Sequence, residues 1–252
     1  MIADLGRRRR EAKLMDQPGL DIRAHHHALT ALGRANIVSR TAASLWPAIR
    51  LAAKAHAGGT AAGRPLRILD VASGGGHLAV ALARRAARDG VRVEITGCDI
   101  SPVAVDYART LALRAGVTGV RFEPVDALTE SWPGEVDVAI CTLFLHHLDE
   151  QDAVTLLCRM RDAARRLVLV SDLRRSATGY VFAWAGCRIL SRSRVFHVDG
   201  TRSVEAAFTP AEAERLAAKA GLDGARVTTH WPQRWMLAWG LLPELFLGAP
   251  QA

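Results

Sequence analysis

Beyond residue 65, short apolar runs alternate with longer segments of helical periodicity, and no other feature constrains the fold as strongly. The strand candidates are 66–72, 91–99, 119–126, 136–143 and 166–173. Helices are expected near 76–88, 102–115 and 149–164. This alternation predicts a doubly wound, mostly parallel α/β sheet, because parallel strands need crossover helices between them. The near-continuous apolarity of the strands predicts that helices cover both faces of the sheet.

The end of the chain departs from this alternation. An apolar insert of helical character runs from residue 176 to about residue 200. A helix is then expected at Thr209–Pro210, because threonine is a good N-cap and proline is favoured at the first helical position. Two further strand candidates, 225–231 and 234–239, form a predicted hairpin. The hairpin brings the sheet to seven strands and makes the last strand antiparallel.

The first 60 residues are alanine-rich and helical in pattern, and we interpret them as a lid over a sheet domain at 61–252. A linker of small residues at 57–65 separates the two regions. Residues 7–10 are consecutive arginines, and the chain carries a net charge of +8. Such a run can anchor nucleic acid or anionic lipid. A solvated basic tail is the simpler interpretation.

Composition removes several classes of protein. A chain of 252 residues that is 50% hydrophobic fits one globular α/β domain, or such a domain with a small appendage. Four cysteines without a C-x-x-C pair argue against a zinc ribbon or a redox motif. No stretch of 18 uncharged apolar residues is present, so no membrane span is expected. The basic N-terminal segment is followed by no apolar stretch, which predicts a cytoplasmic protein without a signal peptide.

The strongest motif is I-L-D-V-A-S-G-G-G-H-L-A at residues 68–79, in which a strand runs into three glycines and a helix follows. Glycines allow the backbone to approach a ligand where a Cβ atom would collide. The N-terminus of the helix adds free N–H groups and the positive end of a dipole. The motif therefore predicts a ligand site centred on Gly74 and Gly76.

Two ligand classes compete for this loop. The G-x-G-x-x-A spacing of residues 74–79 satisfies the dinucleotide fingerprint, with Asp99 at a suitable distance for a ribose. Asp70, however, would repel a pyrophosphate but favour the ammonium or sulfonium group of S-adenosyl-L-methionine. Asp99 can accept from both ribose hydroxyls, and Asp126 can accept from the adenine amino group. Three carboxylates at successive strand ends favour this cationic, phosphate-free nucleoside.

Together these features resemble a Rossmann-like class I S-adenosylmethionine-dependent methyltransferase over roughly residues 64–240. The family's loop is (D/E)-x-G-x-G-x-G, and Ala72 stands here in place of its first glycine. The resemblance implies that Asp99 binds the ribose, that Asp126 contacts the adenine and that Ile100 packs against it. The predicted cofactor residues are Asp70, Ala72, Ser73, Gly74, Gly76, Asp99, Ile100, Asp126, Ala127 and Thr142.

The resemblance extends to the acceptor. Residues 141–149, C-T-L-F-L-H-H-L-D, are similar to a segment of quinone and other small-molecule methyltransferases. The segments E-x-x-L-M-D (11–16), L-R-R-S (173–176) and H-V-D-G (197–200) resemble a bacterial subgroup associated with polyketide or phenolic-lipid pathways. The N-P-P-Y and Pro-Cys motifs of nucleic-acid methylation are absent. In small-molecule members, N-terminal helices and an insert after the fifth strand build the acceptor pocket. The residues expected to share pocket and packing roles are Tyr180, Phe182, Trp184, Ile189 and Phe196.

A phenol needs a base to remove its proton, and histidine has a suitable pKa range. His146 and His147 follow the fourth predicted strand, and His197 lies two residues before Asp199, which could orient it. These three histidines are the catalytic candidates. Residues 25–27 are also histidines, but consecutive helical positions cannot converge on one ion. We therefore predict no metal site, while His25 or His26 could reach the pocket, and His77 is expected to shape the glycine loop.

These features predict a methyltransferase that acts on a small apolar or aromatic acceptor, preferably by O-methylation of a phenolic or polyketide-type compound. C-methylation of a quinol-like ring is the alternative within the class. An NAD(P)-dependent oxidoreductase, a nucleic-acid methyltransferase and a non-catalytic nucleoside-binding relic are the alternatives outside it. We expect a small-molecule acceptor, no nucleic acid, no stable membrane insertion, and a monomer or homodimer.

Overall fold

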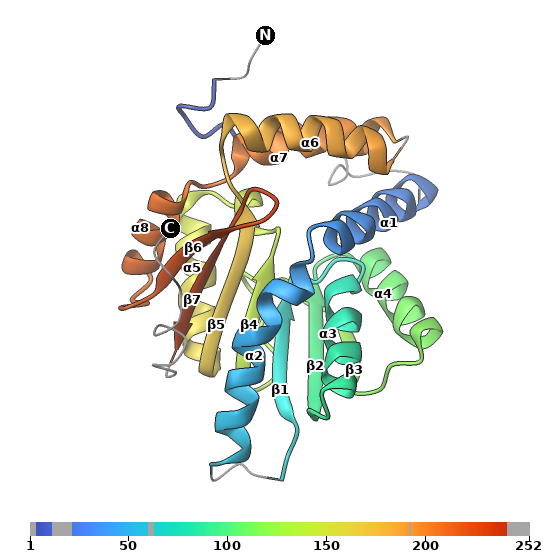
Figure 1. Ribbon diagram of the computed structural model, residues 1–252, viewed down its shortest axis with the longest axis vertical. Coiled ribbons are helices and arrows are strands. Elements are labelled where there is room, and N and C mark those ends of the chain that lie inside the picture. The colour runs from blue at the N-terminus through green and yellow to red at the C-terminus, as the bar shows by residue number, and fades with distance from the viewer. Residues whose placement is uncertain (1–3, 12–21, 60–62, 192, 241–252) are drawn as a thin grey trace.

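The computed structural model describes residues 4–11, 22–59, 63–191 and 193–240, with side chains at 22–26 and 28 left out. Within these ranges the chain forms a seven-stranded sheet of order β3-β2-β1-β4-β5-β7-β6 (Figure 1). The strands are β1 Leu66–Val71, β2 Val93–Asp99, β3 Val120–Pro124, β4 Val136–Thr142, β5 Ala164–Leu173, β6 Arg226–His230 and β7 Arg234–Gly240. β1 to β5 pair in parallel, and β7 is antiparallel to both of its neighbours. The predicted doubly wound sheet with an antiparallel last strand is confirmed.

Helices cover both faces of this sheet, as the strand pattern predicts. The helices are α1 Ile22–Val38, α2 Thr41–Ala57, α3 His77–Arg88, α4 Pro102–Ala115, α5 Glu150–Ala163, α6 Ala177–Leu190, α7 Arg194–Ala206 and α8 Pro210–Lys219. On β1, Ile68 and Leu69 are both fully buried but belong to different hydrophobic clusters. Successive side chains of a strand point to opposite faces, so each residue packs against a different helical layer. α2, α3 and α4 supply one layer, and α5 and α8 supply the other.

Local signals fix where several helices begin. Thr209 caps α8 in a capping box with Glu212, and Pro210 occupies the first helical position, as predicted. Ser101 caps α4 by accepting from the N–H of Ala104, with proline again at the first helical position. Asp149 caps α5 in the same way. The caps of α4 and α5 fix where the loops after β2 and β4 end.

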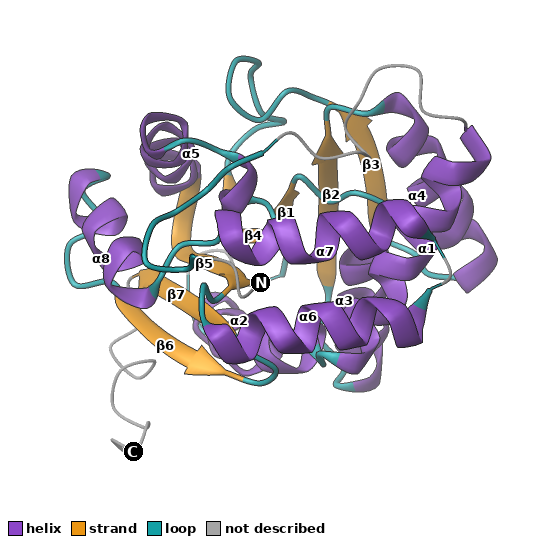
Figure 2. Cartoon of the chain, turned by 90° about the horizontal axis from the view of Figure 1, so that it is seen from above, coloured by secondary structure: helices purple, strands orange, loops and turns teal. Residues whose placement is uncertain are grey.

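The N-terminal region and the insert do not have the simple form that the sequence predicts. α2 packs into the sheet core through Leu45 and Ile49, so of the two described N-terminal helices only α1 lies over the strand ends. The insert consists of two helices, α6 and α7, and continues to Ala206. α6 and α7 run side by side across the carboxyl ends of the strands (Figure 2). Among the described helices, none combines the length and apolar character needed to span a bilayer.

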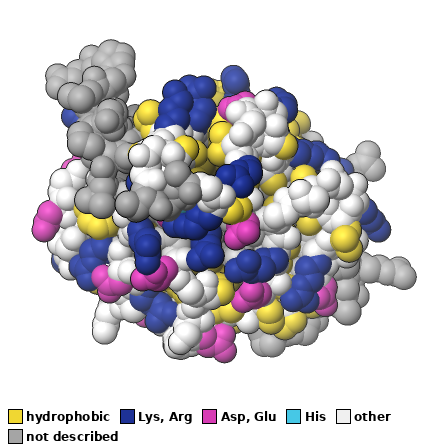
Figure 3. All heavy atoms as spheres, turned by 90° about the horizontal axis from the view of Figure 1, so that it is seen from below, with side chains coloured by type: hydrophobic (Ala, Val, Ile, Leu, Met, Phe, Trp, Pro, Cys, Tyr) yellow, Lys and Arg dark blue, Asp and Glu magenta, His cyan; other side chains and the backbone are white. Residues whose placement is uncertain are grey.

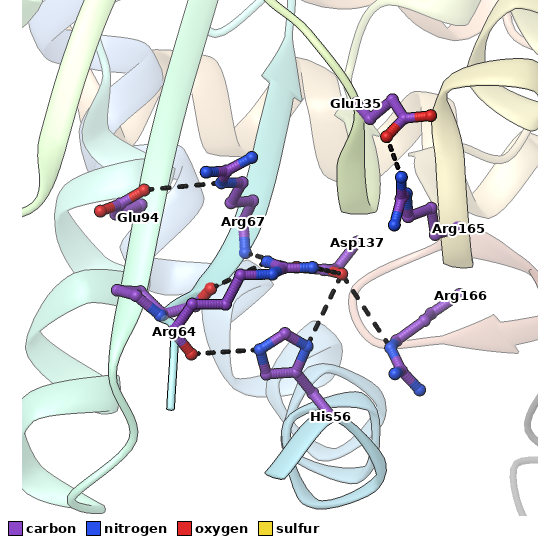
Figure 4. Close-up of polar contacts among 9 residues, drawn as sticks. His56, Arg64, Arg67, Glu94, Glu135, Asp137, Arg165 and Arg166 are labelled. Atoms are coloured by element: carbon purple, nitrogen blue, oxygen red, sulfur yellow. Dashed lines mark hydrogen bonds and ion pairs between the residues drawn. The ribbon is translucent and has the colours of Figure 1, made fainter. Parts of the chain in front are cut away.

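Asp137 lies near the amino end of β4, at the end of the sheet opposite the carboxyl ends of the parallel strands (Figure 4). It is 1% exposed, and it accepts two hydrogen bonds from the guanidinium of Arg64, at 2.7 and 2.8 Å. It also accepts from the N–H of Arg67 at 2.9 Å. Burial alone would raise the pKa of Asp137, but the bonds from Arg64 and Arg67 hold it below its usual value. This cluster ties the α2–β1 connection to β4.

The same end of the molecule carries mixed charge. Lysine and arginine side chains are interspersed with aspartate and glutamate on this face (Figure 3). Arg67 pairs with Glu94, and Arg165 pairs with Glu135. On this face, therefore, the basic side chains do not form one continuous stripe.

Candidate active site

A cavity of about 1040 Å³ opens at the carboxyl ends of the parallel strands, which is where open α/β sheets bind ligands. The loops after β1 to β5 form its floor, and α1, α6, α7 and the β6–β7 turn form its walls. Single-ligand pockets span about 300–1,000 Å³. This cavity therefore has room for a nucleoside cofactor and a second molecule beside it.

The glycine loop uses its residues in different ways. Gly74 has a φ of +52°, and an added Cβ would meet nothing within 4 Å, so it would project into the cavity. Gly76 has a φ of +72°, and an added Cβ would lie 2.6 Å from the ring of Phe122. Gly74 therefore leaves space for a ligand, whereas Gly76 lets the start of α3 pack against β3. Ala72 also has a positive φ, of 54°, which costs a non-glycine residue about 1 kcal/mol.

Asp99 joins the loops that follow β1 and β2. Its Oδ2 atom accepts from the N–H of Gly74 at 2.8 Å, and its Oδ1 atom accepts from the N–H of Ser101 at 3.0 Å. A carboxylate oxygen can accept more than one hydrogen bond, so these bonds orient Asp99 without exhausting its acceptor capacity. Asp99 lines the cavity beside Ile100, a large apolar side chain that is 69% exposed.

Asp126 and Ala127 lie in the loop after β3, and both line the cavity. Asp126 accepts from the N–H of Leu128 at 2.9 Å and from the hydroxyl of Thr129 at 2.8 Å. These hydrogen bonds hold the pKa of Asp126 below its usual value, so the side chain is an anion at neutral pH. Two of the three predicted carboxylates, Asp99 and Asp126, therefore face one cavity.

The third predicted carboxylate, Asp70, lies beneath the loop rather than in the cavity lining. It is 1% exposed, and its Oδ2 atom has no hydrogen-bond partner among the described residues. Burial and the neighbouring charge of Asp99 raise the pKa of Asp70 to about 8. The hydroxyl of Ser73, in the lining above, is also buried without a partner. An open glycine cradle above two unpartnered polar atoms fits the ammonium group in the amino-acid tail of S-adenosylmethionine.

Helix α1 closes the cavity from above the glycine loop. Gly33 lies so close to His77 that an added Cβ would be 2.3 Å from its Nε2 atom. The hydroxyls of Thr30 and Tyr107 hydrogen-bond at 3.1 Å and join α1 to α4. Burial lowers the pKa of His77, which lines the cavity as a neutral side chain at neutral pH. The loop and α1 are thus held together through His77.

The part of the chain that carries the glycine loop and the two facing carboxylates matches known proteins. Residues 68–166 match a family model described as a methyltransferase domain. The ubiquinone biosynthesis O-methyltransferase of Bordetella parapertussis is 32% identical over 162 residues, which cover 62% of each protein. Residues 68–166 belong to a methyltransferase domain. S-adenosylmethionine, the predicted cofactor, is the cofactor of this family of domains.

Further matches have the same character. The ubiquinone biosynthesis O-methyltransferase of Thiobacillus denitrificans is 32% identical over 164 residues, covering 64% of this chain and 66% of that protein. The matched region thus spans just under two thirds of the length of these curated relatives. The apo structure of the methyltransferase SibL is 25% identical, with a TM-score of 0.54, covering 70% of this chain and 50% of that one. An O-methyltransferase family 2 protein from Planctomyces limnophilus shares the fold, with a TM-score of 0.62 at 17% identity, covering 89% of this chain and 63% of that one.

At the ends of β4 and β5, His146 is paired with an aspartate that no sequence signal indicated. Asp172, at the end of β5, is 1% exposed, and its Oδ1 atom lies 2.7 Å from Nδ1 of His146. Its Oδ2 atom accepts from the backbone N–H of the same histidine at 2.9 Å. Burial alone would raise the pKa of Asp172, but the charge and hydrogen bonds of His146 lower it. His146 lines the cavity with its ring fixed by an anion.

The other two catalytic candidates lie in different surroundings. His147 lines the cavity, with its ring centre 4.6 Å from that of His146. His197 lies outside the lining, and its Nε2 atom is 2.6 Å from the carbonyl oxygen of Ser191. Residues two apart leave a helix in different directions, and it is Asp199 that faces the cavity. We therefore do not keep His197 as a catalytic candidate.

The basic N-terminal segment is only partly a solvated tail, because Arg7, Arg9 and Arg10 are exposed whereas Arg8 is half-buried against the protein. The guanidinium of Arg8 lies 3.8 Å from the ring centre of Phe208, and its Nε atom donates to the carbonyl of Ala206 at 2.6 Å. Its Nη2 atom donates to the carbonyls of His146 and Leu148 at 3.1 and 2.5 Å. Arg10 donates to the carbonyl of His147 at 2.9 Å. Residues 4–11 thus form a clasp on the turn that carries both histidines.

Apolar side chains make up most of the acceptor wall. Of the five insert residues that the sequence analysis named, Phe182 and Phe196 line the cavity, whereas Tyr180, Trp184 and Ile189 do not. Trp231, in the β6–β7 turn, also lines it and lies 5.8 Å from the ring centre of Phe182. No sequence signal marked Trp231, because it reaches the cavity only through the hairpin.

Two remaining predictions concern histidines and metals. The side chains of His25 and His26 lie outside the described residues. Within the part of the chain that the structure describes, no group of three histidine, cysteine or acidic residues could hold a metal ion. Thr142, the last predicted cofactor residue, ends β4 and lines the cavity. It lies between the glycine loop and the turn that carries His146 and His147.

Proposed function

We propose that the protein transfers the methyl group of S-adenosylmethionine to an oxygen atom of a small apolar or aromatic acceptor, such as a phenolic or polyketide-type compound. The observation that carries this proposal is the buried His146–Asp172 pair in the wall of an apolar cavity. Relatives about 30% identical are named ubiquinone biosynthesis O-methyltransferases, which supports an aromatic acceptor.

The proposed base is His146. Asp172 accepts a hydrogen bond from Nδ1, which assigns the proton to that atom and makes Nε2 the basic nitrogen. When a phenol gives its proton to Nε2, the imidazolium that forms is stabilised by the carboxylate of Asp172. The two hydrogen bonds from His146 to Asp172, one from the ring and one from the backbone, keep the ring in one orientation. The phenolate oxygen is then the nucleophile.

The cofactor residues act by position. Bound S-adenosylmethionine supplies an electrophilic methyl carbon on a positively charged sulfur. We propose that Gly74 and Ser73 hold the amino-acid tail, that Asp99 accepts from the ribose hydroxyls, and that Asp126 and Ile100 bind the adenine. The apolar walls exclude water from the reacting atoms, which favours a displacement that depends on alignment of the two reactants. The proposal needs a small-molecule acceptor but no nucleic acid or membrane insertion, and it fits a monomer or a homodimer.

The test is His146→Gln in a methyl-transfer assay with a panel of phenols and catechols. We expect kcat to fall by about 100-fold or more, since a general base contributes about 10²–10⁴-fold, while the Kd for S-adenosylhomocysteine stays unchanged. His197→Gln is the matched control, because it removes a histidine outside the cavity lining, and it should retain kcat within a few-fold. Full activity of His146→Gln would show that His146 is not the base. Products methylated on ring carbon would move the reaction to C-methylation.

A further inference from the structure

Arg234 is a buried cation in the wall of the cavity. It is the first residue of β7, is 3% exposed, and lines the cavity. Its Nη1 atom donates to the hydroxyl of Thr41 at 2.7 Å. No carboxylate of the described residues lies within ion-pair distance of its guanidinium. A buried guanidinium without a carboxylate partner is costly, so its presence needs an explanation.

Asp172 does not neutralise this cation. Its charge favours the protonated form of Arg234, but its oxygens accept from His146 and from the N–H of Leu173. The pKa of Arg234 is lowered to about 10 by burial, and the side chain remains a cation at neutral pH. An arginine presents a planar set of donors that suits a carboxylate, and here most of that set is not used by the protein.

Further polar groups surround Arg234 in the cavity wall. The hydroxyl of Thr41 accepts from Arg234 and donates to Oδ1 of Asn36 at 3.2 Å. That bond uses the amide oxygen of Asn36, and its NH₂ group makes no hydrogen bond to the described residues. Asn36 and Arg234 both line the cavity, with Gln233 beside them. Arg234, Asn36 and Gln233 thus form a corner of the cavity that offers a positive charge and amide N–H donors. The Oδ1 atom of Asn36 already accepts a hydrogen bond from Thr41.

The position of this corner assigns it to the acceptor half of the cavity. The proposed cofactor residues lie on and after β1, β2 and β3, whereas β7 lies beyond β4 and β5. Neighbouring strands are about 4.8 Å apart, so β7 is about 14 Å from β1. Arg234 is paired with Leu173, the residue after Asp172, in the β5–β7 ladder. An acceptor whose hydroxyl reaches His146 can therefore extend a second group towards Arg234.

We propose that Arg234 and Asn36 form a carboxylate-binding corner, and that the methyl acceptor is an aromatic or aliphatic molecule that carries a carboxylate in addition to its hydroxyl group. This inference rests on the proposed function. The carboxylate neutralises the guanidinium in two parallel N–H···O bonds, and the amide of Asn36 donates a third. The apolar part of the acceptor lies against Phe182 and Phe196. The corner then fixes which hydroxyl of the acceptor faces the base.

The experiment compares 4-hydroxybenzoate with its neutral isostere 4-hydroxybenzamide, by calorimetry on the protein saturated with S-adenosylhomocysteine. We expect the acid to bind at least about tenfold more tightly, which is about 1.4 kcal/mol. Arg234→Gln should abolish this preference, and Arg234→Lys should keep part of it. Asn36→Leu should weaken the preference for the acid, and it changes no residue of the buried strand β7. This variant therefore still tests the proposal if Arg234→Gln does not fold. Arg188→Gln, which changes an exposed arginine of α6, should leave the preference as in the wild type.

The outcomes separate the inference from the proposed function. If 4-hydroxybenzoate binds more tightly than 4-hydroxybenzamide through Arg234, but no acceptor is methylated, the carboxylate-binding corner is supported and the proposed function is contradicted. If an acceptor is methylated but the acid and the amide bind equally well, the proposed function is supported and the carboxylate-binding corner is contradicted. The cofactor's own carboxylate is the competing occupant, and methylthioadenosine, which lacks the amino-acid tail, tests it. If Arg234→Gln weakens S-adenosylhomocysteine but not methylthioadenosine, the acceptor assignment is overturned.

Discussion

The two halves of the cavity are built by different means. The cofactor half comes mainly from three loops that directly follow adjacent parallel strands, and its predicted residues apart from Thr142 span only positions 70–127. The acceptor half combines α1, α6, α7 and the β6–β7 hairpin, which are far apart in the sequence. A local motif therefore specifies the first half, whereas long-range packing specifies the second. We therefore expect a mutation in one half of the cavity to leave the function of the other half unchanged.

The largest expected effect is confined to the acceptor half. Asp172→Asn removes the anion that fixes the proton on Nδ1 of His146 and stabilises the imidazolium. We expect kcat to fall by about 1,000-fold, while the Kd for S-adenosylhomocysteine changes less than about threefold. Stopped assays and calorimetry on the same preparation check both quantities. A parallel loss of cofactor binding would show that the two halves are not independent.

Asp99→Ala should break the cofactor half alone. The variant loses the bonds proposed to the ribose and also the bond that holds the N–H of Gly74. Hydrogen bonds to a charged group contribute about 1.5–3 kcal/mol each, so the Kd for S-adenosylhomocysteine should rise by about 100-fold. The Kd of a phenolic acceptor should stay within a few-fold of the wild-type value. An unchanged cofactor Kd would remove Asp99 from the site.

Two glycines of one loop sharpen the comparison between folding and binding. Gly76→Ala places a methyl group against Phe122 at a positive φ, which should cost about 2 kcal/mol or more and lower Tm by about 4–8 °C. Gly74→Ala meets only open space, so it should cost about 1 kcal/mol in stability but weaken the cofactor. Thermal melts with and without S-adenosylhomocysteine distinguish them. Equal melting temperatures for the two variants would contradict this assignment of roles.

The smallest effect concerns the buried acid beneath the loop. The pKa of Asp70 in the free protein is raised to about 8, so below that pH the carboxyl is protonated. A cationic cofactor above it favours the ionised form, and binding therefore releases a proton. Cofactor affinity should rise several-fold from about pH 6 to about pH 8 and then level off. In Asp70→Asn this rise should be absent, and a rise of the same size there would assign the linkage to another group.

The meeting of Gly74, Asp99 and Asp126 at one cavity was predictable because each sequence signal is local. Three glycines after an apolar strand, and an aspartate at the end of each of the next strands, locate the loop without any knowledge of packing. The exception is Asp70, whose carboxylate the sequence places beside the ligand. Strand alternation instead buries it beneath the loop, at 1% exposure. Ala72 shows the converse, since it adopts the left-handed conformation that the family's glycine provides.

The acceptor half was predictable only in outline. His146 and its partner Asp172 are 26 residues apart, and Arg234 and Thr41 are 193 apart, so no spacing in the sequence connects them. The expected pairing of His197 with Asp199 illustrates the opposite error. The two residues are close in sequence, but helical geometry sends them in different directions. The insert was correctly predicted to supply aromatic lining, yet which aromatics face inward depends on how α6 and α7 pack.

The clasp of Arg8 has a consequence for the proposed base. The carbonyls that Arg8 and Arg10 hold belong to the same turn as the proposed base, so the leading residues share in setting its position. Replacing Arg8 and Arg10 by alanine would remove three of the hydrogen bonds that hold this turn. A change at the surface of residues 4–11 can therefore alter the proposed base without any change in the cavity lining.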